Sequence, residues 1–233
     1  MTVLVLSDIH ANIEALEAVL ADAAGYDAVW FLGDVVGYGP DPEACVARLR
    51  WLAPEHWLAG NHDWAAVGRM DTHEFNPDAR TAAHWSGRQL SSESFDWIRS
   101  LEPRADVADS GITLVHGSPR QPVWEYVLDR NVAAEGFAHM TSRICFHGHT
   151  HQPTAFEEAV DGVVRHGSDA VGGLDIGLGR WMVNPGSVGQ PRDGDPRASY
   201  ALYDPCGQRF AVHRVAYDIA AVQRKMASRG LPS

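Results

Sequence analysis

The sequence is poor in lysine, and acidic residues outnumber basic ones. Lys225 is the only lysine. The chain has 30 Asp and Glu but only 19 Lys and Arg, so the formal net charge is −11 at pH 7. A protein that binds nucleic acid non-specifically normally needs a basic face. We therefore do not expect long nucleic acid as a partner, whereas a small anionic molecule stays possible because local charge need not follow net charge.

Cysteines and long apolar runs are also scarce. The three cysteines, Cys45, Cys145 and Cys206, are far apart and odd in number, which indicates neither a disulfide framework nor a zinc ribbon. No segment approaches the eighteen or more apolar residues of a membrane span, and the N-terminal residues lack the charged region and cleavage site of a signal peptide. We expect a cytoplasmic protein without a membrane partner.

Six short apolar runs are present, and each ends in a cluster of polar residues. In chain order they are TVLVLSDIH, DAVWFLGDVV, EHWLAGNHD, GITLVHGSP, RICFHGHTH and RWMVNPGS. Runs of this length, rich in Val, Leu, Ile and Trp and without strict alternation, are typical of strands that are buried on both faces.

Helical patterns lie between the early runs. Good capping residues predict four helix starts, at Asn12, Asp41-Pro42, Asn76-Pro77 and Ser91 or Ser92. Residues 64–105 and 118–142 also carry helical patterns, so we expect these long segments between strands to be folded.

The last third is richer in strands. Residues 198–205 and 208–217 resemble neighbouring strands, and the glycine-rich residues 161–180 are interpreted as a hairpin with a mobile tip. The combination favours an α/β sandwich with two sheets over one doubly wound sheet, in a single domain spanning residues 1–233.

The polar clusters contain the residues that could bind a metal ion or take part in catalysis. If every run is a strand, these clusters lie at strand C-terminal ends, where open α/β sheets build their sites. Apart from His62, the set offers seven ligands: Asp8, His10, Asp34, Asn61, His116, His149 and His151. Carboxylate, amide and imidazole ligands together suit Mn²⁺, Fe or Zn²⁺ better than Ca²⁺. Seven ligands exceed the needs of one ion, but a pair bridged by one carboxylate would use them all and could bind a phosphoryl group.

The order of these clusters resembles a known family. The succession Asp8-x-His10, Gly33-Asp34, Gly60-Asn61-His62-Asp63, His116 and Gly148-His149-Thr150-His151 is similar to that of the calcineurin-like metallophosphoesterases. Each element alone is a weak signal, whereas five in order are specific. Residues 184–192, NPGSVGQPR, resemble the small bacterial and archaeal phosphodiesterase branch, so the likeness covers nearly the whole chain.

The resemblance implies a four-layer α-β-β-α sandwich of two mixed sheets with a dinuclear metal site. One ion would bind Asp8, His10 and His151, and the other would bind Asn61, His116 and His149. Asp34 would bridge both ions, together with a water or hydroxide. The ions would be divalent transition metals, with Mn²⁺, Fe and Zn²⁺ all left open.

The resemblance also implies a reaction. A phosphodiester or phosphomonoester would be hydrolysed by direct attack of the bridging hydroxide. His62 would face the leaving-group oxygen as a general acid or charged clamp, and Asp63 would orient the His62 ring through its other nitrogen.

Four further residues are candidate substrate contacts, each with a structural alternative. Asn12 is also a good helix cap, and Arg192 lies among aspartates that could pair with it at the surface. Trp124 and Tyr126 follow a short loop and could equally belong to the core. His147 matches no ligand position of the family, so we expect it to be packed.

Two other kinds of function stay open. A hydrolase of nucleotides, dinucleoside polyphosphates or phosphoproteins would use the same residues, whereas the single lysine argues against a nuclease. A non-catalytic interaction scaffold is less favoured because all seven ligand positions and His62 are present. The natural substrate and the oligomeric state stay undetermined by the sequence.

Overall fold

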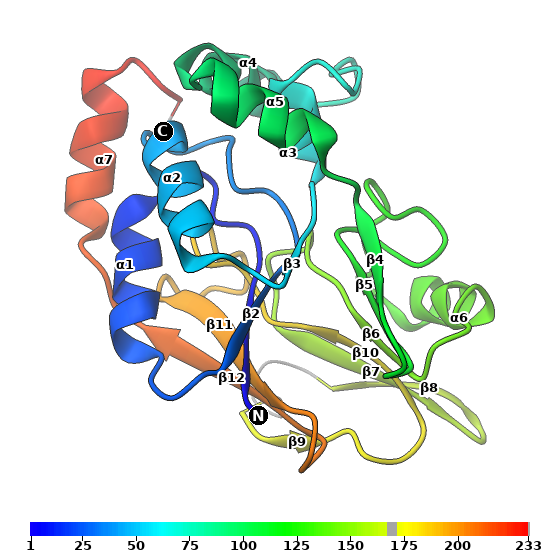
Figure 1. Cartoon of the computed structure of the whole chain (residues 1–233). Helices are drawn as coiled ribbons and strands as arrows, with labels where there is room; N and C mark the ends of the chain where they lie inside the picture. The colour runs from blue at the N-terminus through cyan, green and yellow to red at the C-terminus, as the bar shows by residue number, and fades with distance from the viewer. Residues whose placement is uncertain (167–171, 233) are drawn as a thin grey trace.

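The computed structural model describes residues 1–166 and 172–232 and contains two packed β-sheets with helices outside them (Figure 1). The described strands form two six-stranded sheets, in the orders β3-β2-β1-β11-β12-β9 and β4-β5-β6-β10-β7-β8. The first sheet contains β1 (Val3–Leu6), β2 (Ala28–Phe31), β3 (His56–Trp57), β9 (Leu174–Asp175), β11 (Ala198–Asp204) and β12 (Arg209–Val215). The second contains β4 (Arg104–Val107), β5 (Ile112–Val115), β6 (Ile144–Phe146), β7 (Thr154–Ala159), β8 (Gly162–His166) and β10 (Arg180–Asn184).

All six apolar runs of the sequence are strands, and they form the parallel part of each sheet. Strands β1, β2 and β3 are mutually parallel, and β6 is parallel to both β5 and β10. Every residue of β1, β5 and β6 is buried. Strand β3 differs from the prediction, since it has two half-buried residues at an edge of its sheet. The six C-terminal ends therefore lie along one edge of each sheet.

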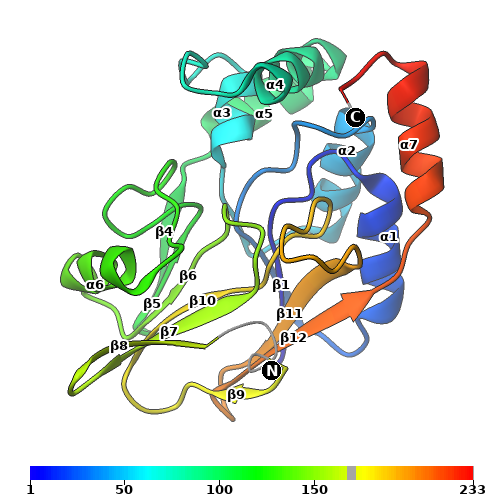
Figure 2. The ribbon, with the colours of Figure 1, turned by 180° about the vertical axis from the view of Figure 1, so that it is seen from behind.

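The helices form the outer layers. Helices α1 (Ile13–Asp22), α2 (Pro42–Leu52) and α7 (Ile219–Ser228) lie on the outer side of the first sheet, and α6 (Arg130–Ala138) covers the second (Figures 1 and 2). Helices α3 (Asn61–Ala66), α4 (Pro77–Gln89) and α5 (Ser92–Ser100) lie at the end toward which β1 runs. None of the helices in the described part of the chain combines the length and apolar character that a membrane span requires.

Three of the four predicted helix caps are confirmed. Side-chain oxygens of Asn12, Asn76 and Ser91 accept hydrogen bonds from main-chain N–H groups three residues later, at 3.0, 2.8 and 3.2 Å. Asp41 precedes α2 as expected, but its side chain makes no capping hydrogen bond. Its carboxylate instead pairs with Lys225 at 2.7 Å and with Arg229 at 3.1 Å, and thereby links α2 to α7.

The core shows why the chain forms four layers. Side chains of a strand alternate between its two faces, so Leu4 and Leu6 of β1 pack with α1 and α2, while Val3 and Val5 pack against the second sheet. A further cluster lies between Phe137 of α6 and the outer face of the second sheet. The predicted α-β-β-α sandwich of two mixed sheets is confirmed.

The prediction of a hairpin over residues 161–180 is wrong in the described part of this segment. Strand β8 pairs with β7 across a two-residue turn, and Gly162 has a φ of 124°, which few other residues adopt. Strand β9 pairs with β12 in the other sheet. The segment thus passes from one sheet to the other, and its predicted tip, residues 167–171, lies outside the described residues. The predicted pairing of β11 with β12 is confirmed.

Candidate metal centre

All seven predicted ligands are buried and lie together at the C-terminal ends of the parallel strands. Two groups have ligand atoms within 4.8 Å of one another: Asp8, His10 and His151 form one, and Asp34, His116 and His149 form the other. The seventh predicted ligand, Asn61, has its Oδ1 atom 3.1 Å from His116 Nε2. The structure thus brings together residues that are up to 143 positions apart, from Asp8 to His151.

Four histidines are held so that one ring nitrogen faces the centre. The other nitrogen of each donates to a main-chain carbonyl: His10 to Val36 at 3.0 Å, His116 to Leu32 at 2.9 Å, His149 to Trp124 at 2.9 Å, and His151 to Gln190 at 2.7 Å. A carbonyl only accepts hydrogen bonds, so the proton of each neutral ring lies on that side and the inward nitrogen carries a lone pair.

The inward nitrogens approach one another closely. His10 Nε2 is 3.0 Å from His151 Nε2, and His116 Nε2 is 3.2 Å from His149 Nδ1. Two lone pairs at this separation repel, so each pair of nitrogens needs a proton or a metal ion between them. The inward nitrogens are therefore placed to bind a cation.

Each aspartate has one free oxygen aimed into the centre. Oδ1 of Asp8 and Oδ2 of Asp34 are buried and accept no hydrogen bond from the described residues. Asp34 Oδ2 lies 3.7 Å from His10 Nε2 and 3.4 Å from His116 Nε2, which belong to different groups. A carboxylate oxygen between two sets of imidazoles has the position of a bridging ligand. On this donor chemistry the residues fit a pair of divalent ions.

The electrostatics of the centre also favour a cation. Burial acts to lower the pKa of His116, but the carboxylates of Asp34 and Asp8 outweigh it and raise that pKa to about 9. Burial holds the pKa of His10 and of His149 well below its ordinary value, so both rings are neutral near neutral pH. The two buried carboxylates thus produce a field that attracts positive charge, which favours a proton on His116 and would equally favour a metal ion in place of that proton.

The loops of the centre adopt a rarely used backbone conformation. Asp8, His10, Asp34, His149 and His151 all have φ between 48° and 65°, a left-handed region that costs free energy for L-residues. Main-chain hydrogen bonds hold the loops in place, for example from Asp8 N to Gly33 O and from His10 N to Asp34 O, both at 3.0 Å. Such strain collects where function requires a fixed geometry.

Two glycines of the sequence motifs are required by close contacts. A Cβ atom on Gly60 would lie 2.1 Å from Asp34 Oδ1, and one on Gly148 would lie 2.0 Å from Ser7 Oγ. Ser7 Oγ in turn donates to Asp8 Oδ2 at 2.6 Å. Glycine at both positions therefore lets neighbouring loops approach the two carboxylates.

His62 lies beside the ligands. Its ring centroid is 4.9 Å from that of His10, 4.6 Å from that of Tyr38 and 5.1 Å from that of Phe75. Its main-chain N–H donates to Asp34 Oδ1 at 2.8 Å. Burial lowers the pKa of His62 to about 4, so its imidazole is neutral near neutral pH.

The predicted contact between Asp63 and the His62 ring is wrong. The Asp63 carboxylate accepts three main-chain N–H groups instead, from Asp34 at 2.8 Å, from Gly60 at 3.0 Å and from Val36 at 3.1 Å. Asp63 occupies the third position of α3, from which a carboxylate reaches back to the start of its helix. It therefore holds the loop that carries Asp34.

The four candidate substrate contacts differ in their surroundings. The Asn12 amide caps α1 and also donates to Gly189 O at 3.0 Å, so it already has structural partners. Trp124 offers its carbonyl to His149, and its ring stacks on Phe75. The Tyr126 ring stacks on His149 at 3.7 Å and is 39% exposed.

Arg192 lies near the same centre. Its guanidinium is 5.6 Å from the ring centroid of Tyr38, and its main-chain N–H donates to His151 O at 3.2 Å. Of the four candidates, Tyr126 and Arg192 therefore have the most open positions beside the ligands.

Sequence reasoning missed Tyr38 and the role of Asn184. Tyr38 has a φ of 55° and packs on His10 and His62, and the two glycines beside it were the available signal. Asn184 Nδ2 contacts Gly148 O at 2.7 Å, Thr150 Oγ1 at 3.1 Å and His147 Nδ1 at 3.2 Å, and so supports the loop of His149 and His151. His147 itself is fully buried behind the centre.

Comparisons with known proteins agree with this geometry. Residues 1–208 match the model of the calcineurin-like phosphoesterase superfamily domain. The protein MJ0912 of Methanocaldococcus jannaschii is 34% identical over 233 residues, covering 98% of this chain and 93% of its own. The crystal structure of a metallophosphoesterase from Sphaerobacter thermophilus is 49% identical, with a TM-score of 0.90 over 100% of this chain and 95% of that one. The structure of PH1004 from Pyrococcus horikoshii shares the fold, with 20% identity and a TM-score of 0.79 over 100% and 94% of the two chains.

A two-sheet sandwich with paired His and Asp groups at its strand ends defines a metallophosphoesterase, a hydrolase of phosphate esters. The chain belongs to the calcineurin-like phosphoesterase superfamily.

Proposed function

We propose that this chain hydrolyses small phosphodiesters or phosphomonoesters at a dinuclear metal centre, by direct attack of water on phosphorus. The observation that carries the proposal is the place of Asp34 Oδ2, which lies between imidazoles of both ligand groups. Two divalent ions bound there would activate water and polarise the phosphoryl group. Asp8, His10 and His151 would hold one ion, Asn61, His116 and His149 the other, and Asp34 both.

The surroundings of the site support attack by water instead of a protein nucleophile. Ser7 Oγ donates to Asp8, and Ser187 Oγ donates to the Asp8 carbonyl at 2.8 Å, so both hydroxyls are used to position that ligand. Burial raises the pKa of the Cys45 and Cys145 thiols, which keeps both protonated and unreactive.

His62 would protonate the leaving-group oxygen in this proposal. Its ring is neutral alone, but the negative charge of a bound phosphate would favour the imidazolium form. The imidazole could then transfer its proton as the P–O bond breaks. Arg192 and Tyr126 would contact the substrate at the mouth of the site, whereas Asn12 and Trp124 would support the ligand loops. A single domain over residues 1–233 and a cytoplasmic location stay predictions.

The test is metal-dependent turnover with a bridging-ligand variant. Hydrolysis of bis-p-nitrophenyl phosphate should vanish after chelation and return with Mn²⁺. Asp34→Asn should lose at least one of two bound ions in metal analysis, because the bridge serves both. Asp96→Asn, on the exposed surface of α5, is the matched control and should keep two ions and full activity. Activity that survives complete metal removal would contradict the proposal.

A further inference from the structure

A small crevice opens beside the predicted ligand His10. It has a volume of about 150 Å³ and lies between α7 and the loops that follow β1, β2 and β10. Tyr38 and Tyr217 line it together with Ile219, Val222 and Met226 of α7. The crevice therefore borders the metal centre through His10, which is the one predicted ligand in its described lining.

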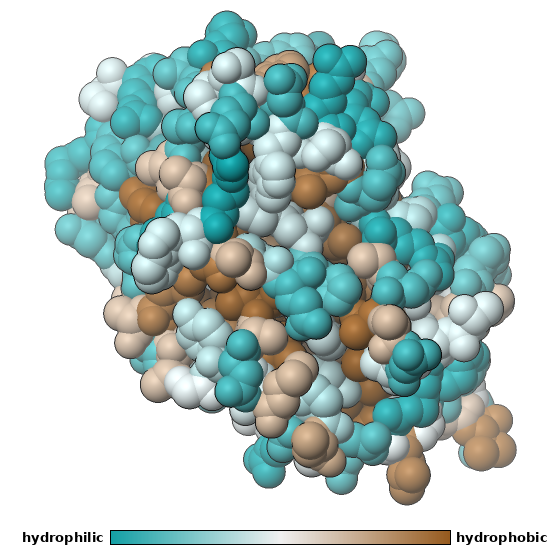
Figure 3. Space-filling model, viewed as in Figure 1, coloured by the Kyte–Doolittle hydropathy of each residue, from teal (hydrophilic) through white to brown (hydrophobic). Residues whose placement is uncertain are grey.

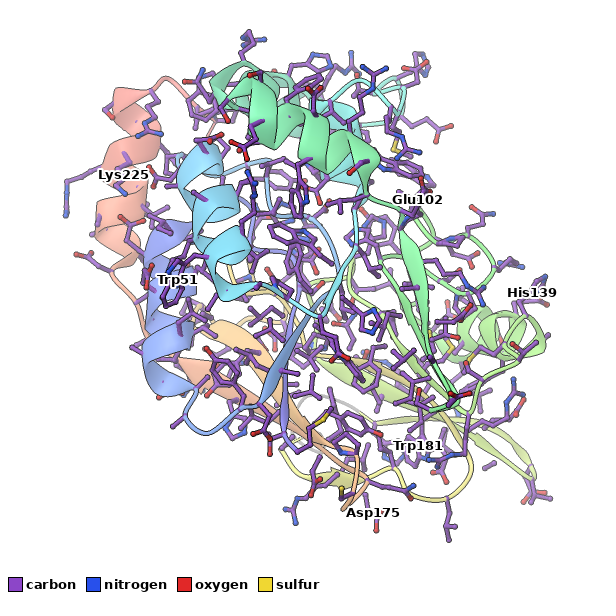
Figure 4. The ribbon with its side chains drawn as sticks, in the orientation of Figure 1. Trp51, Glu102, His139, Asp175, Trp181 and Lys225 are labelled. Carbon is purple, nitrogen blue, oxygen red and sulfur yellow. The ribbon has the colours of Figure 1, made fainter. Side chains whose placement is uncertain are left out.

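The wall contributed by α7 is mainly apolar, with Gln223 as its polar residue, and it is fixed in place. Ile219, Val222 and Met226 follow helical spacing, so they share one face of the helix. Lys225 anchors α7 through Glu14 of α1 at 2.5 Å and Asp41 at 2.7 Å (Figure 4 shows Lys225 on this helix). The helix and the core below it thus present a preformed apolar surface toward His10.

Tyr38 connects the crevice to the metal centre. Its ring meets the His10 ring edge-on at 4.9 Å and lies 4.6 Å from the His62 ring. The Arg192 guanidinium lies 5.6 Å from the centroid of the same ring. Tyr38 therefore separates the crevice from the metal centre, and a group attached to a phosphoryl unit there would pass this ring to enter the crevice.

The lining indicates the kind of group that fits. None of the described lining residues is Asp, Glu, Lys or Arg, and the Asn12 amide is already bonded to Ala15 N and Gly189 O. The face shown in Figure 3 is mainly hydrophilic, with hydrophobic groups gathered in limited clusters. A cavity of about 150 Å³ accepts a molecule of the size of benzene, whereas larger ligands need roughly 300 Å³ or more.

We propose that this crevice is a subsite for a single aromatic ring carried by the substrate, attached to phosphorus or to its ester oxygen. The substrate class would then be phosphate esters with one small aromatic substituent. The inference rests on the proposed function, because the metal centre must bind the phosphoryl unit that places the ring.

Binding of two phosphonates tests the subsite without turnover. Phenylphosphonate and methylphosphonate carry the same charged group, so calorimetry with the Mn²⁺-loaded protein compares the ring with a methyl group. We expect phenylphosphonate to bind at least tenfold more tightly, because the ring leaves water. Ile219→Trp should fill the crevice and remove the preference, whereas Ala220→Trp, on the exposed face of α7, should keep it. Equal affinities for the two phosphonates in the unmodified protein would overturn the inference.

A second variant and a kinetic comparison complete the test. Met226→Ala should enlarge the crevice and raise the affinity for 1-naphthylphosphonate relative to phenylphosphonate, and an unchanged ratio would count against the subsite. Turnover is compared on the monomethyl esters of phenylphosphonate and methylphosphonate, which both release methanol and carry no ring on the ester oxygen. Metal-dependent hydrolysis without preference for the phenyl compound would refute the subsite and keep the proposed function. Selective phosphonate binding without metal-dependent hydrolysis of bis-p-nitrophenyl phosphate would refute the proposed function and keep the subsite.

Discussion

His62 lies among the metal ligands, yet its ring packs on His10, Tyr38 and Phe75 and belongs to neither ligand group. We predict that His62→Ala keeps both ions and lowers kcat by about 10²–10⁴-fold, the usual contribution of a general acid. The loss should be larger for alkyl esters than for p-nitrophenyl esters, because p-nitrophenolate leaves without protonation. Turnover on the two ester types, with metal analysis, measures this effect.

The control for this variant is His84→Ala, which removes an exposed histidine of α4 and should change neither kcat nor the number of bound ions. An equal loss on both ester types would mean that His62 only binds the phosphoryl oxygens. A missing ion would mean that His62 is a ligand.

Asp63, unlike His62, has a structural role, because its carboxylate binds main-chain groups of the ligand loops. Its carboxylate holds the N–H groups of Asp34, Val36 and Gly60. In Asp63→Asn one acceptor oxygen becomes an NH₂ donor that faces N–H groups, so the Asp34 loop should shift. We predict metal affinity about 10–100-fold lower, as is typical when the support of a ligand is lost. A competition titration with a chelator measures it, and Asp96→Asn is again the control. Unchanged metal affinity with a lower kcat would contradict this role and restore a link to His62.

Helix α7 returns from the C-terminal end of the chain to pack beside α1, and charged groups fasten it there. Asp41 is 9% exposed and contacts both Lys225 and Arg229, whose side chains are 36% and 39% exposed. We predict that Asp41→Asn lowers the free energy of unfolding by about 1 kcal/mol, since solvent screens such partly exposed pairs. The melting temperature should fall by a few degrees.

The salt dependence of this effect is a second check. Glu17→Gln breaks the more exposed pair with Arg48 and should have a smaller effect. In 1 M NaCl the difference between the Asp41 variant and the unmodified protein should shrink. A difference that grows with salt would show that Asp41 acts through packing and not through charge.

Elements with strong local signals could be predicted from the sequence, whereas those defined by distant partners could not. Asn12, Asn76 and Ser91 act within one helical turn, so the sequence alone indicates their caps. The pairing of β9 with β12 and the return of α7 to Asp41 depend on contacts between residues that are far apart in the chain. The ligands carried strong motif signals. The partners of Asp63 depended on the course of the loops around it, which residue spacing does not show.

At the scale of the whole molecule, folding and metal binding should be separable. Most residues of the apolar cores on both sheets lie outside the ligand loops, so the chain does not depend on ions to bury most of its apolar surface. We predict a folded metal-free protein with a lower melting temperature. Ions that bind only the folded state add about 2.7 kcal/mol of stability at 100 times their Kd. Circular dichroism and calorimetry, with and without chelator, measure both quantities. A coil-like spectrum after chelation would contradict the prediction.

The ligand loops of the two sheets are joined directly, through hydrogen bonds at 3.0 Å from Val188 N to Ser7 O and from Gly189 N to Asp8 O. Each ligand group takes residues from both sheets, so the distances within it depend on the alignment of one sheet on the other. That alignment is set by rings packed between the sheets, such as Trp30, Phe146 and Tyr203. A substitution among these rings would shift one sheet relative to the other. The distances within both ligand groups would then change together, while the hydrogen bonds within each sheet stayed intact.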